Sequence, residues 1–162
     1  MENGINDNDY VDLGLPSNNL WMKHLIGMKS DTDIDHAKIW DWYHDWNYDI
    51  GDKGCEIPTK DDLDELVKYT DKHFTEINGV KGVKFTSRTN SNSLFIPFAG
   101  FCSPYACCSV LGQNMSVGLW SSETHILNKN HAYFLHLSKD YSCFVLEEGK
   151  ANGNAVLGVR HK

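Results

Sequence analysis

The stretch Ala132-Tyr-Phe-Leu-His-Leu-Ser138 places Tyr133, Leu135 and Leu137 at a spacing of two, which is typical of a β-strand with one face toward a core. Three further short apolar runs flank it in the last third of the chain, at residues 118–122, 142–146 and 155–160. Helical periodicity is confined to the first half. This order of elements predicts an α+β protein with an antiparallel sheet and excludes a doubly wound parallel sheet.

Two helices are predicted in the first half. The segment His36–Trp46 follows a capping residue, Asp33 or Asp35, and repeats aromatic side chains at helical spacing. The segment Thr59–Phe74 has the clearer start, because the Thr59 hydroxyl can accept a hydrogen bond from the backbone N–H three residues later. Apolar residues at helical spacing then extend this second helix to Phe74.

The remaining elements of the first two thirds are predicted to be strands, turns and one loop. Period-two alternation and turn residues give the following assignment: strand, turn and strand over Tyr10–Trp21, a turn over residues 77–82, strands at residues 83–86 and 94–96, and a long packed loop over residues 99–116.

Length and charge limit the classes of function. The 162 residues, 41% hydrophobic, predict a single domain over residues 1–162 with a flexible N-terminal segment, residues 1–9. The formal net charge of −7 gives nucleic acid no electrostatic reason to bind. The apolar runs are too short to span a membrane. Because residues 1–10 resemble no secretory signal, we expect either cytoplasmic synthesis with a location in a virion, or a surface location if a leader has been removed.

Motifs for catalysis and metal binding are absent from the sequence. GxSxG, GxxxxGK[ST], GxGxxG and HExxH do not occur, so no cofactor and no metal site are expected. Cys102, Cys107 and Cys108 lack the spacing of zinc ligands, and an odd total of five cysteines excludes a complete disulfide framework. A nucleophilic pair of Cys143 with His136 across neighbouring strands stays open.

Several collinear motifs resemble the Fibrobacter succinogenes major paralogous domain family, which is common in Bacteroidetes. The resemblance covers about residues 10–161. The motifs are Tyr10-Val-Asp-Leu-Gly-Leu-Pro-Ser17 with Leu20-Trp21, Ile57-Pro-Thr-Lys-Asp-Asp-Leu-Asp-Glu-Leu66, Asn78-Gly-Val-Lys-Gly82, Asn92-Ser-Leu-Phe-Ile-Pro-Phe-Ala-Gly100, Trp120-Ser-Ser122 and Gly158-Val-Arg160.

This resemblance implies a C-type-lectin-like fold, with two helices packed on a twisted antiparallel sheet and with neighbouring termini. Variable proteins of diversity-generating retroelements share that broad fold and bind ligands through their C-terminal third; formylglycine-generating enzymes share it too. The calcium-dependent sugar motifs of animal lectins are absent, since Ser121 and Ser122 follow Trp120. The catalytic cysteines of the formylglycine enzymes match no cysteine of this chain.

We therefore expect a non-enzymatic recognition or adhesion module that binds a cell-surface protein or glycan through its C-terminal third. A phage receptor-binding protein or a retroelement-diversified variable protein would fit this description. The polar segments Glu123–His131 and Glu148–Asn154 suit a binding face, and period two directs Phe134 and His136 outward, unless Phe134 packs under a neighbouring loop. The candidate ligand-binding residues are Glu123, His125, Asn128, Asn130, His131, Phe134, His136 and Tyr141.

Two alternatives remain at this stage. The first is a structural module that assembles a virion or a surface fibre, as a homo-oligomer or attached to a larger particle, with the tryptophan-rich helix as its contact. The second is an enzyme that uses a cysteine or a histidine in a cleft.

Overall fold

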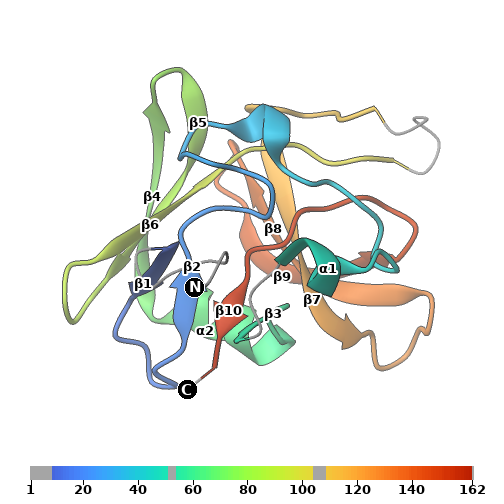
Figure 1. Cartoon of the computed structure of the whole chain (residues 1–162), viewed down its shortest axis with the longest axis horizontal. Coiled ribbons are helices and arrows are strands. Elements are labelled where there is room, and N and C mark those ends of the chain that lie inside the picture. The colour runs from blue at the N-terminus through green and yellow to red at the C-terminus, as the bar shows by residue number, and fades with distance from the viewer. Residues whose placement is uncertain (1–8, 51–53, 104–108, 162) are drawn as a thin grey trace, which may run out of the picture.

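Strands dominate the molecule, as the alternation of the last third indicates. The computed structural model describes residues 9–50, 54–103 and 109–161 (Figure 1). Two α-helices and mostly antiparallel sheets confirm the α+β class. In chain order the elements are β1 (Tyr10–Asp12), β2 (Leu20–Met22), the 3-10 helix η2 (Ile34–His36), α1 (Trp46–Ile50), β3 (Cys55–Glu56), α2 (Lys60–Lys68), β4 (Thr70–Ile77), β5 (Val80–Ser87), β6 (Ser93–Pro97), β7 (Ser116–Thr124), β8 (His131–Ser138), β9 (Cys143–Gly149) and β10 (Val159–Arg160).

The strands of the described residues form three sheets, whereas one twisted sheet was expected. Their orders are β1-β2-β10-β3, β4-β5-β6 and β7-β8-β9. Gly100, which follows β6 in the chain, forms an isolated parallel bridge with Val117 of β7. The first sheet brings β10, near the end of the chain, into contact with β2.

Helix α2 begins where the sequence predicts and ends earlier. The Thr59 hydroxyl accepts a hydrogen bond from the Asp62 backbone N–H at 3.1 Å, and the Asp62 carboxylate accepts one from the Thr59 N–H at 2.8 Å. The helix stops at Lys68, and the predicted extension to Phe74 is wrong. Residues 70–77 instead pair in full register with β5 across a tight turn at Asn78-Gly79, a dipeptide that favours two-residue hairpins.

The predicted helix over His36–Trp46 does not form. Its backbone is used for long-range pairing: Trp40 forms an antiparallel bridge with Asn154, and the Trp40 carbonyl accepts a hydrogen bond from the Trp120 indole at 3.0 Å. The Trp42 indole donates to the Ser121 carbonyl at 2.9 Å. These contacts outweigh the weak intrinsic helix preference of an aromatic-rich segment. The alternative of a structural module had assigned its contact to this helix, which the structure does not contain.

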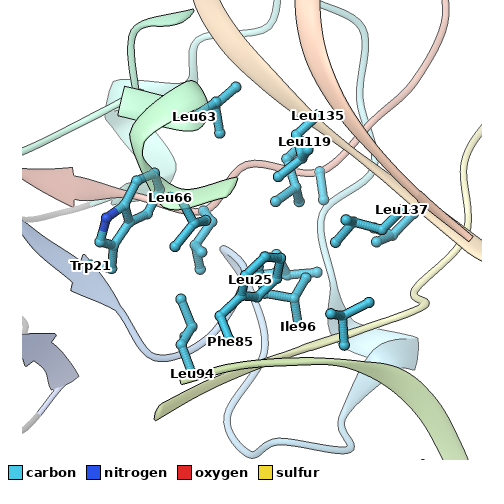
Figure 2. Packing of buried hydrophobic residues seen from close by; sticks show 14 of the residues in the cluster. Trp21, Leu25, Leu63, Leu66, Phe85, Leu94, Ile96, Leu119, Leu135 and Leu137 are labelled. Atoms are coloured by element: carbon cyan, nitrogen blue, oxygen red, sulfur yellow. The ribbon is translucent and has the colours of Figure 1, made fainter. Parts of the chain in front are cut away.

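The main core lies between α2 and the strands of the second and third sheets. Leu63 and Leu66 of α2 are fully buried, and Figure 2 shows them among Trp21, Phe85, Ile96, Leu119, Leu135 and Leu137. A second cluster, which includes Trp46, Trp120 and Phe134, covers the opposite face of β7 and β8. Strands β7 and β8 are therefore buried on both faces over part of their length.

Two expectations concern the chain as a whole, namely the flexible segment over residues 1–9 and the lack of a membrane span. Residues 1–8 of the predicted flexible segment lie outside the described residues, and the carbonyl of Asp9 accepts a hydrogen bond from the Lys23 backbone at 2.9 Å. Within the ranges that the structure describes, no helix has the length and apolar character needed to cross a membrane.

Truncation of a core leucine tests this packing. Leu66→Ala removes a side chain with no exposed surface, so we expect the free energy of unfolding to fall by about 2–5 kcal/mol. Leu127→Ala is the matched control, because Leu127 is 87% exposed and its truncation should change stability by less than about 0.5 kcal/mol. Urea unfolding of both variants measures the difference, and equal losses would contradict the proposed core.

Candidate functional site

A cavity of about 310 Å³ opens on the face of the third sheet that points away from the main core. Its lining includes Phe134 and His136 of β8, Glu148 of β9 and Gly118 of β7, together with Phe101 and Asn154 from irregular segments. We call it the sheet-face cavity. Its volume falls at the lower end of the range of about 300–1,000 Å³ that is typical of small-molecule sites.

The strand register explains why these side chains share a face. In the antiparallel pairs Gly118 lies opposite His136, and Ala132 lies opposite Glu148. Directly opposed residues point to the same side of a sheet, and residues two apart on one strand do so as well. Phe134 therefore lies on this face between Ala132 and His136, while Leu135 points into the main core.

Gly118 creates the space in which Asn154 sits. A Cβ atom at position 118 would lie 2.2 Å from Asn154 Oδ1 and 3.1 Å from Phe134 Cδ2. Any residue larger than glycine would therefore collide with the Asn154 side chain. Asn154 is only 2% exposed, and its backbone N–H and carbonyl both pair with Trp40, at 3.0 and 3.1 Å. Its amide donates a hydrogen bond to the Glu148 carboxylate. The asparagine thus positions the acidic group of the cavity.

The electrostatic character of the cavity follows from burial. Burial raises the pKa of Glu148, while hydrogen bonds from the Asn154 and Asn152 amides act in the opposite direction. Burial lowers the pKa of His136, whose Nδ1 lies 2.9 Å from the Ser142 hydroxyl. His136 is therefore neutral at pH 7. Among the described lining residues, Glu148 is the one side chain that can carry charge at that pH.

Five of the eight predicted residues lie at the hairpin that joins β7 to β8, away from the cavity lining. Glu123 accepts a hydrogen bond from the Lys60 backbone at 2.5 Å at the start of α2. The His125 ring lies 5.2 Å from that of Tyr133. Asn128 accepts a hydrogen bond from the backbone of Asn130, and His131 is paired with Glu147. Most of these side chains stabilise local structure.

The other three predicted residues divide between two places. Phe134 and His136 share the sheet-face cavity, but the expectation of an exposed Phe134 is wrong: it is 6% exposed and lies edge-on to Trp120, 6.1 Å between ring centroids. The structure instead agrees with the alternative given above, in which Phe134 packs under neighbouring residues. Tyr141 is 74% exposed and lies in a separate groove of about 470 Å³. Its ring centroid is 5.0 Å from that of Phe74. The predicted residues therefore do not form one continuous surface.

Sequence reasoning omitted most of the cavity lining. Glu148, Asn152 and Asn154 belong to a polar segment that was expected to suit a binding face, although none of them was chosen as a site residue. Gly118, inside an otherwise buried strand, is a signal of close approach that could have pointed to the site. Phe101 lies in a segment without periodicity and carries no such signal.

The pairing of Cys143 with His136 as a nucleophilic site is not supported by the geometry. Cys143 lies opposite Leu137, and His136 lies opposite Phe144, so the two side chains point to opposite faces of the sheet. Burial raises the pKa of the Cys143 thiol to about 11. Cys107 and Cys108 lie outside the described residues. In the part of the chain that the structure describes, no group of three histidine, cysteine or acidic side chains could hold a metal ion.

Substitution at Gly118 tests the packing around Asn154. We expect Gly118→Ala to displace Asn154, disturb the cavity and lower the free energy of unfolding by about 1–3 kcal/mol, as overpacking does. Gly149→Ala in β9 is the matched control, because its added Cβ meets nothing nearer than 3.9 Å. Thermal unfolding compares the two variants. A Gly118→Ala protein as stable as the Gly149→Ala protein would show that Asn154 is not held as described.

Comparisons with known proteins identify no relative: the chain matches no protein-family model, no curated protein and no solved structure. The resemblance to the Fibrobacter succinogenes family stays a prediction from its motifs. The geometry of the sheet-face cavity is therefore the ground for assigning a function.

Proposed function

We propose that the protein is a non-enzymatic recognition module that binds a cell-surface glycan or protein through the sheet-face cavity and its rim. The observation that carries the proposal is a preformed cavity in which aromatic rings, two amides, a neutral histidine and a carboxylate converge. Small-ligand sites typically combine apolar walls with a few well-placed polar groups.

The rim of the cavity offers further contact area. Phe144 and Leu146 of β9 lie opposite His136 and Phe134, so they share the face on which the cavity opens. They are 62% and 47% exposed. Exposed apolar side chains grouped beside a cavity are common at interaction sites. A partner could cover them while one of its groups enters the cavity.

The floor of the cavity has little freedom to move. Trp120 and Phe134 pack against each other on one face of the sheet, and Leu119 and Leu135 are fully buried on the other. Close-packed interiors tolerate small displacements poorly. A rigid frame of this kind loses little conformational entropy when a ligand binds, which favours recognition.

A C-type-lectin-like architecture belongs to the same proposal. It is supported by the collinear motifs, by the two helices, and by the meeting of β1, β2 and β10 in one sheet. Genome context tests the two biological settings that fit it. A neighbouring reverse transcriptase with a template repeat matching the codons of residues 120–160 would favour a retroelement-diversified protein, and adjacent tail genes would favour a phage receptor-binding protein.

Two histidine variants distinguish the cavity from the hairpin as the binding surface. His136→Ala changes the cavity wall, and we expect binding to glycan arrays and host cells to weaken at least about 10-fold. His125→Ala makes the same substitution at the hairpin between β7 and β8 and should leave binding unchanged. Loss of binding in the His125 variant alone would move the site to the hairpin.

The reactivity of Cys143 tests the non-enzymatic assignment at this thiol. A pKa of about 11, against about 9 for an ordinary thiol, leaves about 100-fold less thiolate near neutral pH. We expect iodoacetamide to modify Cys143 about 100-fold more slowly in the folded protein than in urea, as followed by peptide mass spectrometry at pH 7.5. Rapid modification of the folded protein would indicate an activated thiol.

A further inference from the structure

The charge of the sheet-face cavity is unbalanced. Glu148 contributes a carboxylate, and the described residues that line the cavity include no lysine and no arginine. His131, which acts on Glu148 electrostatically, is already paired with Glu147. A carboxylate in such a place is stabilised by its two amide donors and has no cationic partner in the cavity wall.

We infer that the cavity takes an amino sugar, a pyranose whose free primary ammonium group pairs with the Glu148 carboxylate. The inference rests on the proposed function, since it names the ligand class of the same site. An ammonium group placed beside a half-buried carboxylate interacts more strongly than it would in water, because the surroundings screen less. A neutral sugar in the same position would cover the carboxylate and leave its charge unmatched.

The rest of the cavity suits a pyranose ring. The aromatic rings of Phe101 and Phe134 supply apolar surface for the C–H face of a sugar. His136, Ser116 and Asn152 supply hydrogen-bonding groups for hydroxyls along the wall. A volume of about 310 Å³ accepts a single sugar ring with its substituents, and the rim leaves room for the next residue of a glycan.

Acid should weaken this binding. Because burial raises the pKa of Glu148, its carboxylate becomes protonated at a higher pH than an exposed glutamate and loses its attraction for an ammonium group. Glu147 on β9 and His131 on β8 also act on Glu148 electrostatically, although the register directs their side chains to the opposite face of the sheet. His136 lines the cavity with Glu148. Protonation of His136 adds positive charge to the cavity wall and acts in the same direction as protonation of Glu148.

Titrations followed by saturation-transfer NMR test the inference at pH 7 with three methyl glycosides. Methyl β-D-glucosaminide carries the ammonium group, while methyl β-D-glucoside and methyl N-acetyl-β-D-glucosaminide are neutral. We expect the glucosaminide to bind at least about 10-fold more tightly than either neutral sugar. Glu148→Gln should abolish that preference, and Glu123→Gln, an exposed glutamate outside the cavity lining, should retain it.

A second variant keeps the test decisive if Glu148→Gln does not fold. Ser116→Lys places an ammonium group on the cavity wall, where it should compete with the ligand and abolish glucosaminide binding. Retention of the preference in a folded Glu148→Gln or Ser116→Lys protein would overturn the inference.

The remaining outcomes separate this inference from the proposed function. Equal binding of neutral and amino sugars would refute the ammonium pairing and leave glycan recognition standing. Tighter binding of Nα-acetyl-lysine methylamide than of the glucosaminide would refute the sugar and point to a protein ligand. If none of these probes binds, the inference is refuted. If the protein also fails to bind glycan arrays and host cells, the proposed function is refuted as well.

Discussion

Two backbone hydrogen bonds that join Ala155 to β7 hold the candidate site together. The Ala155 N–H donates to the Gly118 carbonyl, and the Trp120 N–H donates to the Ala155 carbonyl, both at 2.9 Å. This short parallel pairing places Asn154 over Gly118 and buries Val156 in the cluster with Trp120. Buried backbone groups that lose such partners are costly, so the segment has one favourable position.

The tryptophan-rich segment supports the same arrangement from outside. The Lys150 ammonium lies 4.1 Å from the centre of the Trp42 ring and donates to the Thr124 hydroxyl at 2.8 Å. Lys150 is only 7% exposed, which is rare for a lysine and is compensated here by the aromatic face and the hydroxyl. Trp42, through Lys150, and the backbone of Trp40, through Asn154, therefore help to fix the chain that carries Glu148 and Asn154.

The sequence could predict those parts of the fold that interactions between residues close in the chain determine. The start of α2 was predictable because Thr59 and Asp62 are three residues apart and satisfy each other's backbone groups. The end of α2 was not, since the hairpin pairing of residues 70–77 competes with helix formation and includes partners up to 17 residues away. The helix over His36–Trp46 failed for the same reason, with Asn154 as the distant partner.

The candidate site shows the same division between local and distant determinants. Period two correctly put Phe134 and His136 on one face of β8, because that relation lies within a single strand. Whether the face is open depends on Trp120, Asn154 and Val156, which approach it from other segments. The face of β8 that carries Phe134 and His136 is therefore partly buried in the second cluster and partly exposed in the cavity. The hairpin residues that were predicted to bind ligand lie outside the cavity lining.

The position of β10 has a consequence for how the protein acquires its structure. This strand, at the red end of the chain in Figure 1, lies between β2 and β3, and it alone connects them within their sheet. During synthesis β2 and β3 emerge more than 100 residues before β10, so the first sheet is complete only after residue 160 has left the ribosome. Contacts of such long sequence separation slow folding, which exposes early segments to chaperones and proteases in the meantime.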